Sequence, residues 1–263
     1  MKKYFSILFF SLILFQQSSY TQVFEDVGND IIEFLNTGKD LTTDFVKFDK
    51  STQLNLVGSA VLIGAGYSID NNVKDFAQKN SSTFNDGLFS IDNVYGAGIT
   101  LIGIGGLYGY GVIFKDKEVR KIGLQTIEAV GYSGIIESIL KSAVGRSRPY
   151  TNEGKAKFRP FNFNAAHTSF PSGHSTVSFA VSTVLANNTD NVYLKIFCFT
   201  ASTLVCCARI YHSDHWLSDT ITGGLLGYFA GNYVSSKNTL QKESGDKLSV
   251  NFSLTGVDLS LAF

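Results

Sequence analysis

The sequence predicts an all-α protein, a bundle of several helices that associates with a membrane. Long apolar stretches alternate with short polar breaks, and their lengths suit helices better than strands. These stretches are Leu54–Ile69, Val94–Phe114, Ile122–Val144, Ser172–Ala186, Val192–Ile210 and Leu217–Val234. Glycines recur within them, which favours close packing of neighbouring helices. The second stretch alone contains Gly103, Gly105, Gly106, Gly109 and Gly111.

The composition indicates one domain with terminal appendages. The chain has 263 residues, equal numbers of basic and acidic side chains, and no Pro- or Ser-rich linker. A net charge of zero lacks the basic surface that nucleic acids require, so we expect no nucleic-acid partner. Only 17% of the residues are charged and 44% are hydrophobic, which favours contact with a membrane.

The chain begins with the pattern of a secretory signal or a short anchor. Lys2 and Lys3 precede an apolar run from Tyr4 to Phe15, and a polar stretch follows. This run is too short to span a bilayer comfortably. We therefore expect residues 1–20 to direct the protein to the cell envelope, 21–53 to form an exported segment, 54–235 the helical domain and 236–263 a tail.

Charge placement predicts which end of the bundle faces outward. The turn from Lys115 to Lys121 is the densest basic segment, and such segments favour the cytoplasmic side of a membrane. Counting from it puts residues 145–171 and 211–216 on the exported, periplasmic face. The stretch Leu54–Ile69 would invert this count if it crossed, so we expect it to be interfacial or re-entrant. A soluble bundle in which nothing spans is the alternative.

Three short blocks carry the chemistry. They are Lys141 with Arg148-Pro149, then Pro171-Ser172-Gly173-His174, then Arg209 with His215 and Asp219. A transferring phosphoryl group spreads negative charge over its oxygens, and cations and aligned N–H donors neutralise that charge. Lys141, Arg148 and Arg209 suit this task. Antiparallel neighbouring helices would bring the three blocks to one end of the bundle.

The two histidines suggest separate tasks. Ser172 can cap a helix that starts at Gly173, where free N–H groups form an anion site. His174 then stands where it can protonate a leaving alkoxide. His215 and Asp219 are four residues apart, which places them on one helix face. The carboxylate can accept a hydrogen bond from one imidazole nitrogen and leave the other free as a nucleophile.

These blocks resemble the three-part signature of the type 2 phosphatidic acid phosphatase (PAP2) family, related to the vanadium haloperoxidases. The resemblance covers about residues 120–235 and implies a helical-bundle phosphatase that uses neither a metal nor another cofactor. It implies His215 as nucleophile, Asp219 as its orienting partner and His174 as general acid. The residues implied to bind phosphate are Lys141, Arg148, Ser172, Gly173 and Arg209. One departure is Ala208, where the family often has Ser.

The motif predicts the type of reaction, hydrolysis of a phosphate ester, but it does not identify the alcohol that carries the phosphate. We expect a phosphorylated lipid, either a monoester or a diphosphate, hydrolysed by a membrane enzyme whose site faces the periplasm. A soluble periplasmic acid phosphatase of broad specificity is the alternative. A vanadium-dependent haloperoxidase and a non-catalytic membrane scaffold are further readings.

The loop between the first two blocks is rich in aromatic residues. Tyr150, Phe158, Phe161, Phe163 and Phe170 lie there, and we expect them to be buried over the site rather than to admit a lipid chain. Arg159 and His167 share the loop, and we expect both to be solvated.

Overall fold

The computed structural model describes residues 23–44, 50–244, 248–253 and 256–261. The expected signal or anchor, residues 1–20, lies outside them. A helix over residues 23–44 is followed by α2 (Lys50–Lys79), α3 (Thr83–Phe89), α4 (Gly98–Ile113), α5 (Lys117–Val144), α6 (Gly173–Asn187), α7 (Val192–Tyr211) and α8 (Leu217–Ser244). Each predicted apolar stretch forms the main part of one of these helices. The all-α bundle is therefore confirmed.

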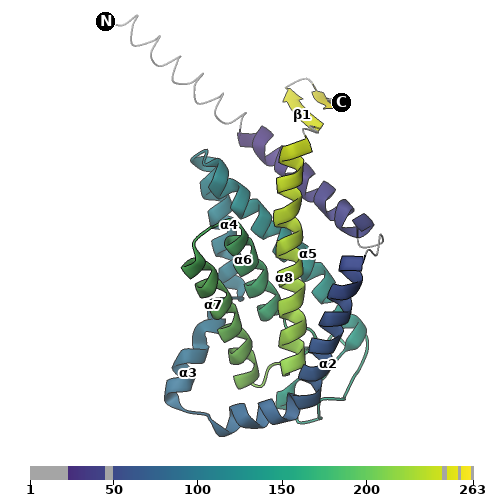
Figure 1. The fold of residues 1–263 in the computed structure, drawn as a ribbon, viewed down its shortest axis with the longest axis vertical. Coiled ribbons are helices and arrows are strands. Elements are labelled where there is room, and N and C mark those ends of the chain that lie inside the picture. The colour runs from purple at the N-terminus through teal and green to yellow at the C-terminus, as the bar shows by residue number, and fades with distance from the viewer. Residues whose placement is uncertain (1–22, 45–49, 245–247, 254–255, 262–263) are drawn as a thin grey trace, which may run out of the picture.

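Short elements connect and follow the helices. Within the described residues, the 3₁₀ turns are η1 (Ser90–Asn93), η2 (Pro149–Thr151) and η3 (Ala165–His167). Beyond α8, strands β1 (Leu248–Ser253) and β2 (Gly256–Leu261) pair antiparallel, with Leu248 opposite Leu261. The hairpin lies outside the bundle, at the end where α8 finishes (Figure 1).

Helix α5 delivers the first block to the opposite end. It starts after Asp116, whose side chain accepts hydrogen bonds from the N–H groups of Glu118 and Val119. It ends at Gly145, which has a φ of 60° and donates to the Lys141 carbonyl at 3.0 Å. A Cβ at Gly145 would lie 1.8 Å from the Arg159 carbonyl oxygen, so only glycine fits. Lys141 is thereby held in the last helical turn, beside the loop that follows.

Helices α5, α6 and α8 form the centre of the bundle. Their shared core contains Ala129 and Tyr132 from α5, Ala180 and Val184 from α6, and Ala230 and Val234 from α8. Helix α8 approaches α6 through small residues. A Cβ at Gly223 would lie 2.3 Å from the Ser172 carbonyl oxygen, and one at Gly227 would lie 2.2 Å from that of Thr176.

The glycines of α4 behave differently from the prediction. A Cβ added at Gly103, Gly105, Gly106 or Gly109 would meet nothing within 4 Å. Among the glycines singled out in this stretch, close packing occurs at Gly111, where a Cβ would lie 2.3 Å from the Arg120 nitrogen. The expected close approach is wrong for the other α4 glycines because they face outward or line a groove rather than a helix interface.

Many polar side chains lie inside the bundle, and many large apolar side chains lie on its surface. Helix α6 buries Ser175, Thr176, Ser178, Ser182 and Thr183, whereas large apolar side chains stand exposed on the outer faces of α2, α4, α5 and α7. Among the described helices, α7 is long and apolar enough to cross a membrane. The segment Thr83–Asn93 with α4 is a second candidate, bent by 45°.

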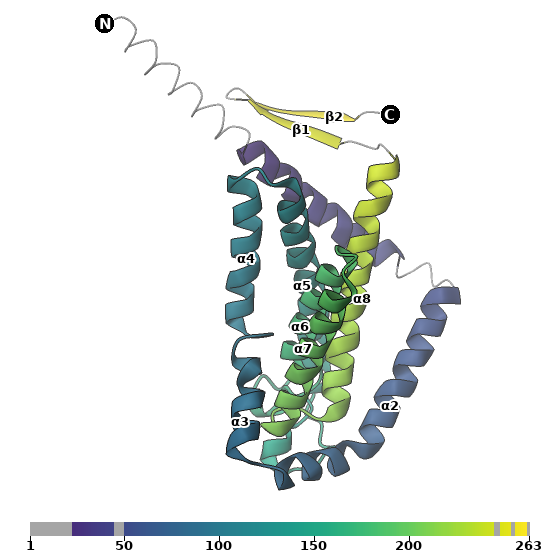
Figure 2. The same cartoon turned by 60° about the vertical axis from the view of Figure 1, so that its left-hand side comes forward.

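The loops that carry the three blocks meet at one end of the bundle (Figure 1). Residues 145–172 connect α5 to α6, and residues 212–216 connect α7 to α8. The helix over residues 23–44 crosses the other end (Figure 2). It is fixed there by an ion pair of 2.8 Å between Asp30 and Arg120 and by contact of Phe34 with Tyr132.

Candidate active site

The structure brings the predicted site residues together. The Lys141 ammonium donates to the Pro171 carbonyl at 2.5 Å, which joins the first block to the second. The Ser172 N–H donates to the Asp219 carbonyl at 3.0 Å, which joins the second block to the third. The Arg209 carbonyl, at the end of α7, accepts from the His215 N–H at 3.2 Å. Residues from the ends of α5, α6, α7 and α8 therefore share one region.

His215 is held by a backbone carbonyl. Its Nδ1 atom lies 2.6 Å from the Ser169 carbonyl oxygen. A carbonyl only accepts hydrogen bonds, so Nδ1 carries the proton and Nε2 keeps a free lone pair. The nearest Asp219 oxygen, Oδ2, is 3.9 Å from Nδ1. The expected hydrogen bond between His215 and Asp219 is therefore not made.

The missing hydrogen bond between His215 and Asp219 has a local cause. The four-residue spacing places two side chains together only if both belong to a helix. Helix α8 begins at Leu217, so His215 lies in the turn before it, while Asp219 lies in its first turn. The backbone turn directs the imidazole toward residue 169 instead.

Asp219 reaches His215 indirectly. It is fully buried and accepts from the Ser169 hydroxyl at 2.6 Å and from the Trp216 N–H at 2.8 Å, both through Oδ2. Ser169 thus binds Asp219 through its side chain and His215 through its carbonyl. The carboxylate fixes the residue that fixes the imidazole.

A buried arginine completes this network, and sequence reasoning missed it. Arg146 is 1% exposed and donates to Asp219 Oδ1 at 2.6 Å and to Asp70 Oδ2 at 2.7 Å. Asp70, from α2, also accepts from the N–H and hydroxyl of Ser218. Buried charges persist when they are paired and hydrogen-bonded. The position of Arg146 between Lys141 and Arg148 in the sequence could have indicated that it belongs to the site. The residues next to Asp70 in the sequence give no such indication.

The predicted phosphate-binding cations, Lys141, Arg148 and Arg209, already have carboxylate partners. We call these three residues the cation cluster. Lys141 forms a short ion pair with Glu137. Asp214 bridges the two arginines, at 3.4 Å from Arg148 and 2.7 Å from Arg209. Asp92, at the end of η1, pairs with Arg209 at 2.9 Å. These carboxylates were also missed. Asp92 and Asp214 pair through contacts between separate elements, whereas the four-residue spacing of Glu137 and Lys141 on one helix was an available signal.

The start of α6 lies against the same cluster. Ser172 is its N-cap residue, but its side chain makes no capping hydrogen bond, contrary to the expected cap. Its hydroxyl instead accepts from Ser175 at 3.0 Å. A Cβ at Gly173 would lie 2.9 Å from Glu137 Oε1, so the helix N-terminus is close to the carboxylate that pairs with Lys141. The first N–H groups of a helix have no acceptor within it and suit an anion.

Burial and positive charge keep both histidines neutral. Burial, together with the Arg209 charge, lowers the pKa of His174 to about 4. Burial, followed by the charges of Arg148, Lys141 and Arg209, lowers the pKa of His215 well below its ordinary value. A neutral imidazole is the form that can act as a nucleophile. A proton donor must be protonated, and a bound phosphate would raise the pKa of His174 by opposing the Arg209 charge.

The α5–α6 loop departs from the prediction. Phe161 is 71% exposed and Phe163 78% exposed, and Tyr150 and Phe158 are also exposed. The expected burial of these aromatic rings is wrong. Arg159 donates to Glu153 at 2.7 Å and to His167 Nε2 at 2.7 Å. These two residues form a polar cluster with Glu153 rather than standing alone in solvent.

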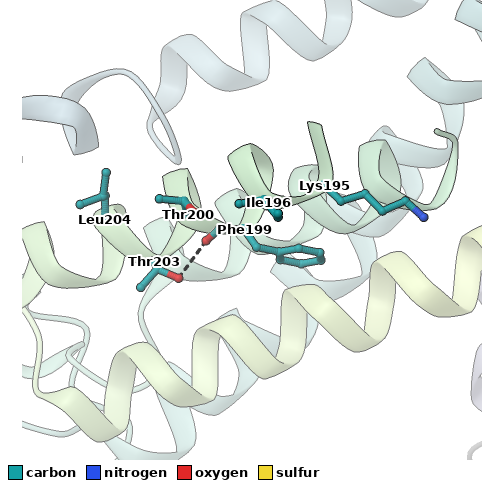
Figure 3. Close-up of a pocket in the computed structure, with 6 residues that line it drawn as sticks. All are labelled: Lys195, Ile196, Phe199, Thr200, Thr203 and Leu204. Atoms are coloured by element: carbon teal, nitrogen blue, oxygen red, sulfur yellow. Dashed lines mark hydrogen bonds between the residues drawn. The ribbon is translucent and has the colours of Figure 1, made fainter. Parts of the chain in front are cut away.

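A hollow on α7 lies apart from the site. A shallow hollow is lined by α7 alone, at Lys195, Ile196, Phe199, Thr200, Thr203 and Leu204 (Figure 3). None of the site residues borders it. Within the described part of the chain, no group of three or more His, Cys, Asp or Glu side chains is arranged to hold a metal ion.

Comparison with known proteins finds a family model and several relatives that match part of this chain. Residues 123–241 match the PAP2 superfamily. The chain is 33% identical over 114 residues to lipid A 1-phosphatase of Rhizobium etli, covering 41% of this chain and 47% of that protein. Lipid A 1-phosphatase of Porphyromonas gingivalis is 24% identical over 180 residues, covering 68% of this chain and 36% of that protein. The chain thus spans about half the length, or less, of these curated relatives.

Two crystal structures share the fold. LpxE of Aquifex aeolicus superimposes with a TM-score of 0.51 and 23% identity, covering 64% of this chain and 95% of that one. A transmembrane PAP2-type phosphatidylglycerolphosphate phosphatase of Bacillus subtilis gives a TM-score of 0.53 and 20% identity, covering 82% of this chain and 97% of that one. At these identities the likeness establishes the fold alone.

Proposed function

We propose, from the match of residues 123–241 to the PAP2 superfamily, that this chain is a metal-independent phosphatase that hydrolyses a lipid phosphate through a phosphohistidine. One observation carries the proposal: His215, with Nδ1 bound to the Ser169 carbonyl at 2.6 Å and Nε2 free, shares one end of the bundle with the cation cluster. A nucleophile of fixed tautomer beside an anion site is what phosphoryl transfer requires.

The reaction is a double displacement. Nε2 of His215 donates its lone pair to phosphorus, and the bond from phosphorus to the lipid oxygen breaks. His174 gives its proton to that oxygen, so the alcohol leaves neutral. A water molecule then attacks the phosphohistidine and loses a proton to His174, releasing inorganic phosphate and restoring His215. The Ser169 carbonyl, facing Nδ1–H at 2.6 Å, stabilises the positive imidazole of the intermediate.

The surface supports a lipid rather than a soluble substrate. Exposed apolar side chains on α4 and α7, such as Ile102 at 76% and Phe197 at 68%, suit contact with acyl chains. Two relatives are lipid A 1-phosphatases, which favours a phosphorylated lipid in the same class. We propose that the protein resides in the cell-envelope membrane with its site facing the periplasm, as the basic segment from Lys115 to Lys121, at the start of α5, indicates.

The test compares phosphate release from phosphatidate and lipid A in detergent with release from p-nitrophenyl phosphate, all with EDTA. His215→Ala should abolish turnover of every substrate, and His212→Ala, an exposed histidine in the same turn, should retain it. Rapid quenching with labelled substrate should trap label on the wild-type protein and none on His215→Ala.

Each outcome decides something. Unchanged turnover by His215→Ala would overturn the mechanism. Hydrolysis of p-nitrophenyl phosphate without any lipid turnover would favour the soluble acid phosphatase. Loss of activity in EDTA that added metal restores would contradict a metal-independent reaction.

A further inference from the structure

A groove runs beside the site between α4, α5 and α6. It is an open groove of about 470 Å³, and its walls include Ile104 and Leu107 from α4 and Val181 and Leu185 from α6. Figure 2 shows α4 lying along α5 and α6 on this side of the bundle. The surface inside the groove is almost wholly apolar, so a polar ligand would lose hydrogen bonds to water without replacement.

The few polar groups at the groove are already occupied. The Thr126 hydroxyl donates to the Ile122 carbonyl at 2.6 Å, and the Thr100 hydroxyl donates to the Val94 carbonyl at 2.6 Å. The Tyr95 hydroxyl lies 2.6 Å from Ser182 Oγ. The groove therefore offers apolar contact and no free donor, which suits a hydrocarbon chain.

One short segment connects the groove to the cation cluster. Asp92 binds Arg209 at 2.9 Å, and Val94 and Tyr95 form the adjacent wall of the groove. Gly96 has a φ of 85°, and a Cβ there would lie 2.5 Å from the His174 carbonyl oxygen. The same few residues thus contact a phosphate-binding arginine, the general acid's backbone and the groove.

The cation cluster and the apolar groove are arranged to suit an amphiphilic ligand. Along α6, Leu185 lies about 16 Å from His174, at 1.5 Å of rise per residue. Cations and free N–H groups gather at the beginning of that path, and apolar walls follow it. A lipid with a phosphate at one end and a hydrocarbon chain at the other matches this order.

We propose that this groove binds an acyl chain of the lipid phosphate while the phosphate lies against the cation cluster. The inference rests on the proposed function, since the chain belongs to the substrate of that site. The groove is then the part of the protein that makes long-chain esters better substrates than short-chain ones.

Two glycines of α4 provide a matched test. Gly103 lines the groove, and Gly105, which does not, is two residues away on the opposite side of the helix. A Cβ at either position meets nothing within 4 Å, so both Gly103→Leu and Gly105→Leu are compatible with the fold, and both favour a helix. Each variant is assayed with dioleoyl phosphatidate, dihexanoyl phosphatidate and p-nitrophenyl phosphate in one detergent.

Gly103→Leu should raise KM for the dioleoyl ester about tenfold, because its side chain would displace part of the acyl chain from the groove. Tenfold is about the effect of losing the burial of roughly two CH₂ groups. Turnover of p-nitrophenyl phosphate should stay at the wild-type value, which also reports that the variant is folded. Gly105→Leu should match wild type on all three substrates.

Two results would overturn the inference. Gly103→Leu could leave the dioleoyl ester unaffected, or it could change all three substrates equally. Either result, with an active wild type that cleaves lipids, leaves the proposed function standing. A wild type that cleaves no phosphate ester would overturn the proposed function and this inference with it.

Discussion

His215 donates from Nδ1 to the carbonyl oxygen of Ser169 at 2.6 Å, while the nearest oxygen of Asp219 is 3.9 Å away. The backbone, which cannot be removed by side-chain substitution, sets the tautomer of the imidazole. Asp219 acts on it through the hydroxyl of Ser169. Ser169 and Asp219 therefore orient the His215 imidazole together, whereas the spacing in the sequence predicts that Asp219 does so alone.

Asp219→Asn should reduce kcat by about 10- to 100-fold, by analogy with carboxylates that orient a metal-bound histidine without touching the metal. A loss of about 10⁴ is typical when the substitution reverses the tautomer, and the Ser169 carbonyl prevents that here. Ser169→Ala, which keeps the carbonyl, should lose less. The measurement is kcat with p-nitrophenyl phosphate; a loss as large as that of His215→Ala would contradict the relay.

Arg146→Leu should destabilise the protein by about 3–5 kcal/mol, because it leaves the buried carboxylates of Asp70 and Asp219 without their cation. Arg159→Leu is the matched control, since its partner Glu153 is exposed and solvent screens such a pair, so its loss should have a much smaller effect. Thermal unfolding in detergent measures both. Equal shifts for the two variants would show that burial of the Arg146 network adds nothing.

The pH profiles of kcat/KM and kcat should differ, because the first reports the pKa values of the free enzyme and the second those of the enzyme–substrate complex. The pKa of His174 is about 4 in the free protein, so the protonated acid becomes more abundant as pH falls from 7 toward 4, and kcat/KM should rise. His215 does not oppose this rise at once, because its pKa is also well below the ordinary value. Bound phosphate raises the pKa of His174, so the kcat profile should bend at a higher pH than that of kcat/KM.

His174→Asn provides the control for this profile. It should remove the bend, and it should slow a lipid ester more than p-nitrophenyl phosphate, whose leaving group needs no proton. Identical profiles for wild type and His174→Asn would exclude His174 as the titrating acid.

Asp214→Asn should lower KM and kcat together. The carboxylate pairs with Arg148 and Arg209 and in the proposed reaction would compete with substrate for them. Its loss should strengthen phosphate binding about fivefold, equivalent to about 1 kcal/mol for a partly exposed ion pair. The same carboxylate raises the pKa of His174, so its loss makes the proton donor scarcer. Steady-state kinetics measures the split. Asp190→Asn, exposed in the turn between α6 and α7, should change neither value.

Patterns along the chain predict the helices and the gathering of the three blocks. The apolar stretches were long enough to identify α2 and α4 to α8, because burial or lipid contact of a whole helix leaves a continuous signal. Antiparallel neighbours then bring Lys141, His174 and Arg209 to one end. The carboxylates Asp70, Asp92 and Asp214 leave no such signal, since each becomes informative only when folding places it beside an arginine.

Two errors share a physical origin. Burial was predicted for Phe161 and Phe163 from their aromatic character, and close packing was predicted for the α4 glycines. Burial of aromatic rings is the rule where apolar groups avoid the surroundings, and close packing at glycines requires a neighbouring helix on that face. Here the outer faces of several helices are apolar and α6 is rich in buried hydroxyl groups, so residue type alone does not tell inside from outside.

The stretch that resembles known phosphatases begins at residue 123, yet Asp70 and Asp92 lie before it and pair with Arg146 and Arg209. A domain boundary drawn by similarity would separate the arginines from their counter-charges. The working unit is therefore larger than the recognisable one. Across relatives, substitutions at these two acidic positions should be matched by changes at their arginines, even where the remaining N-terminal sequence has diverged beyond alignment.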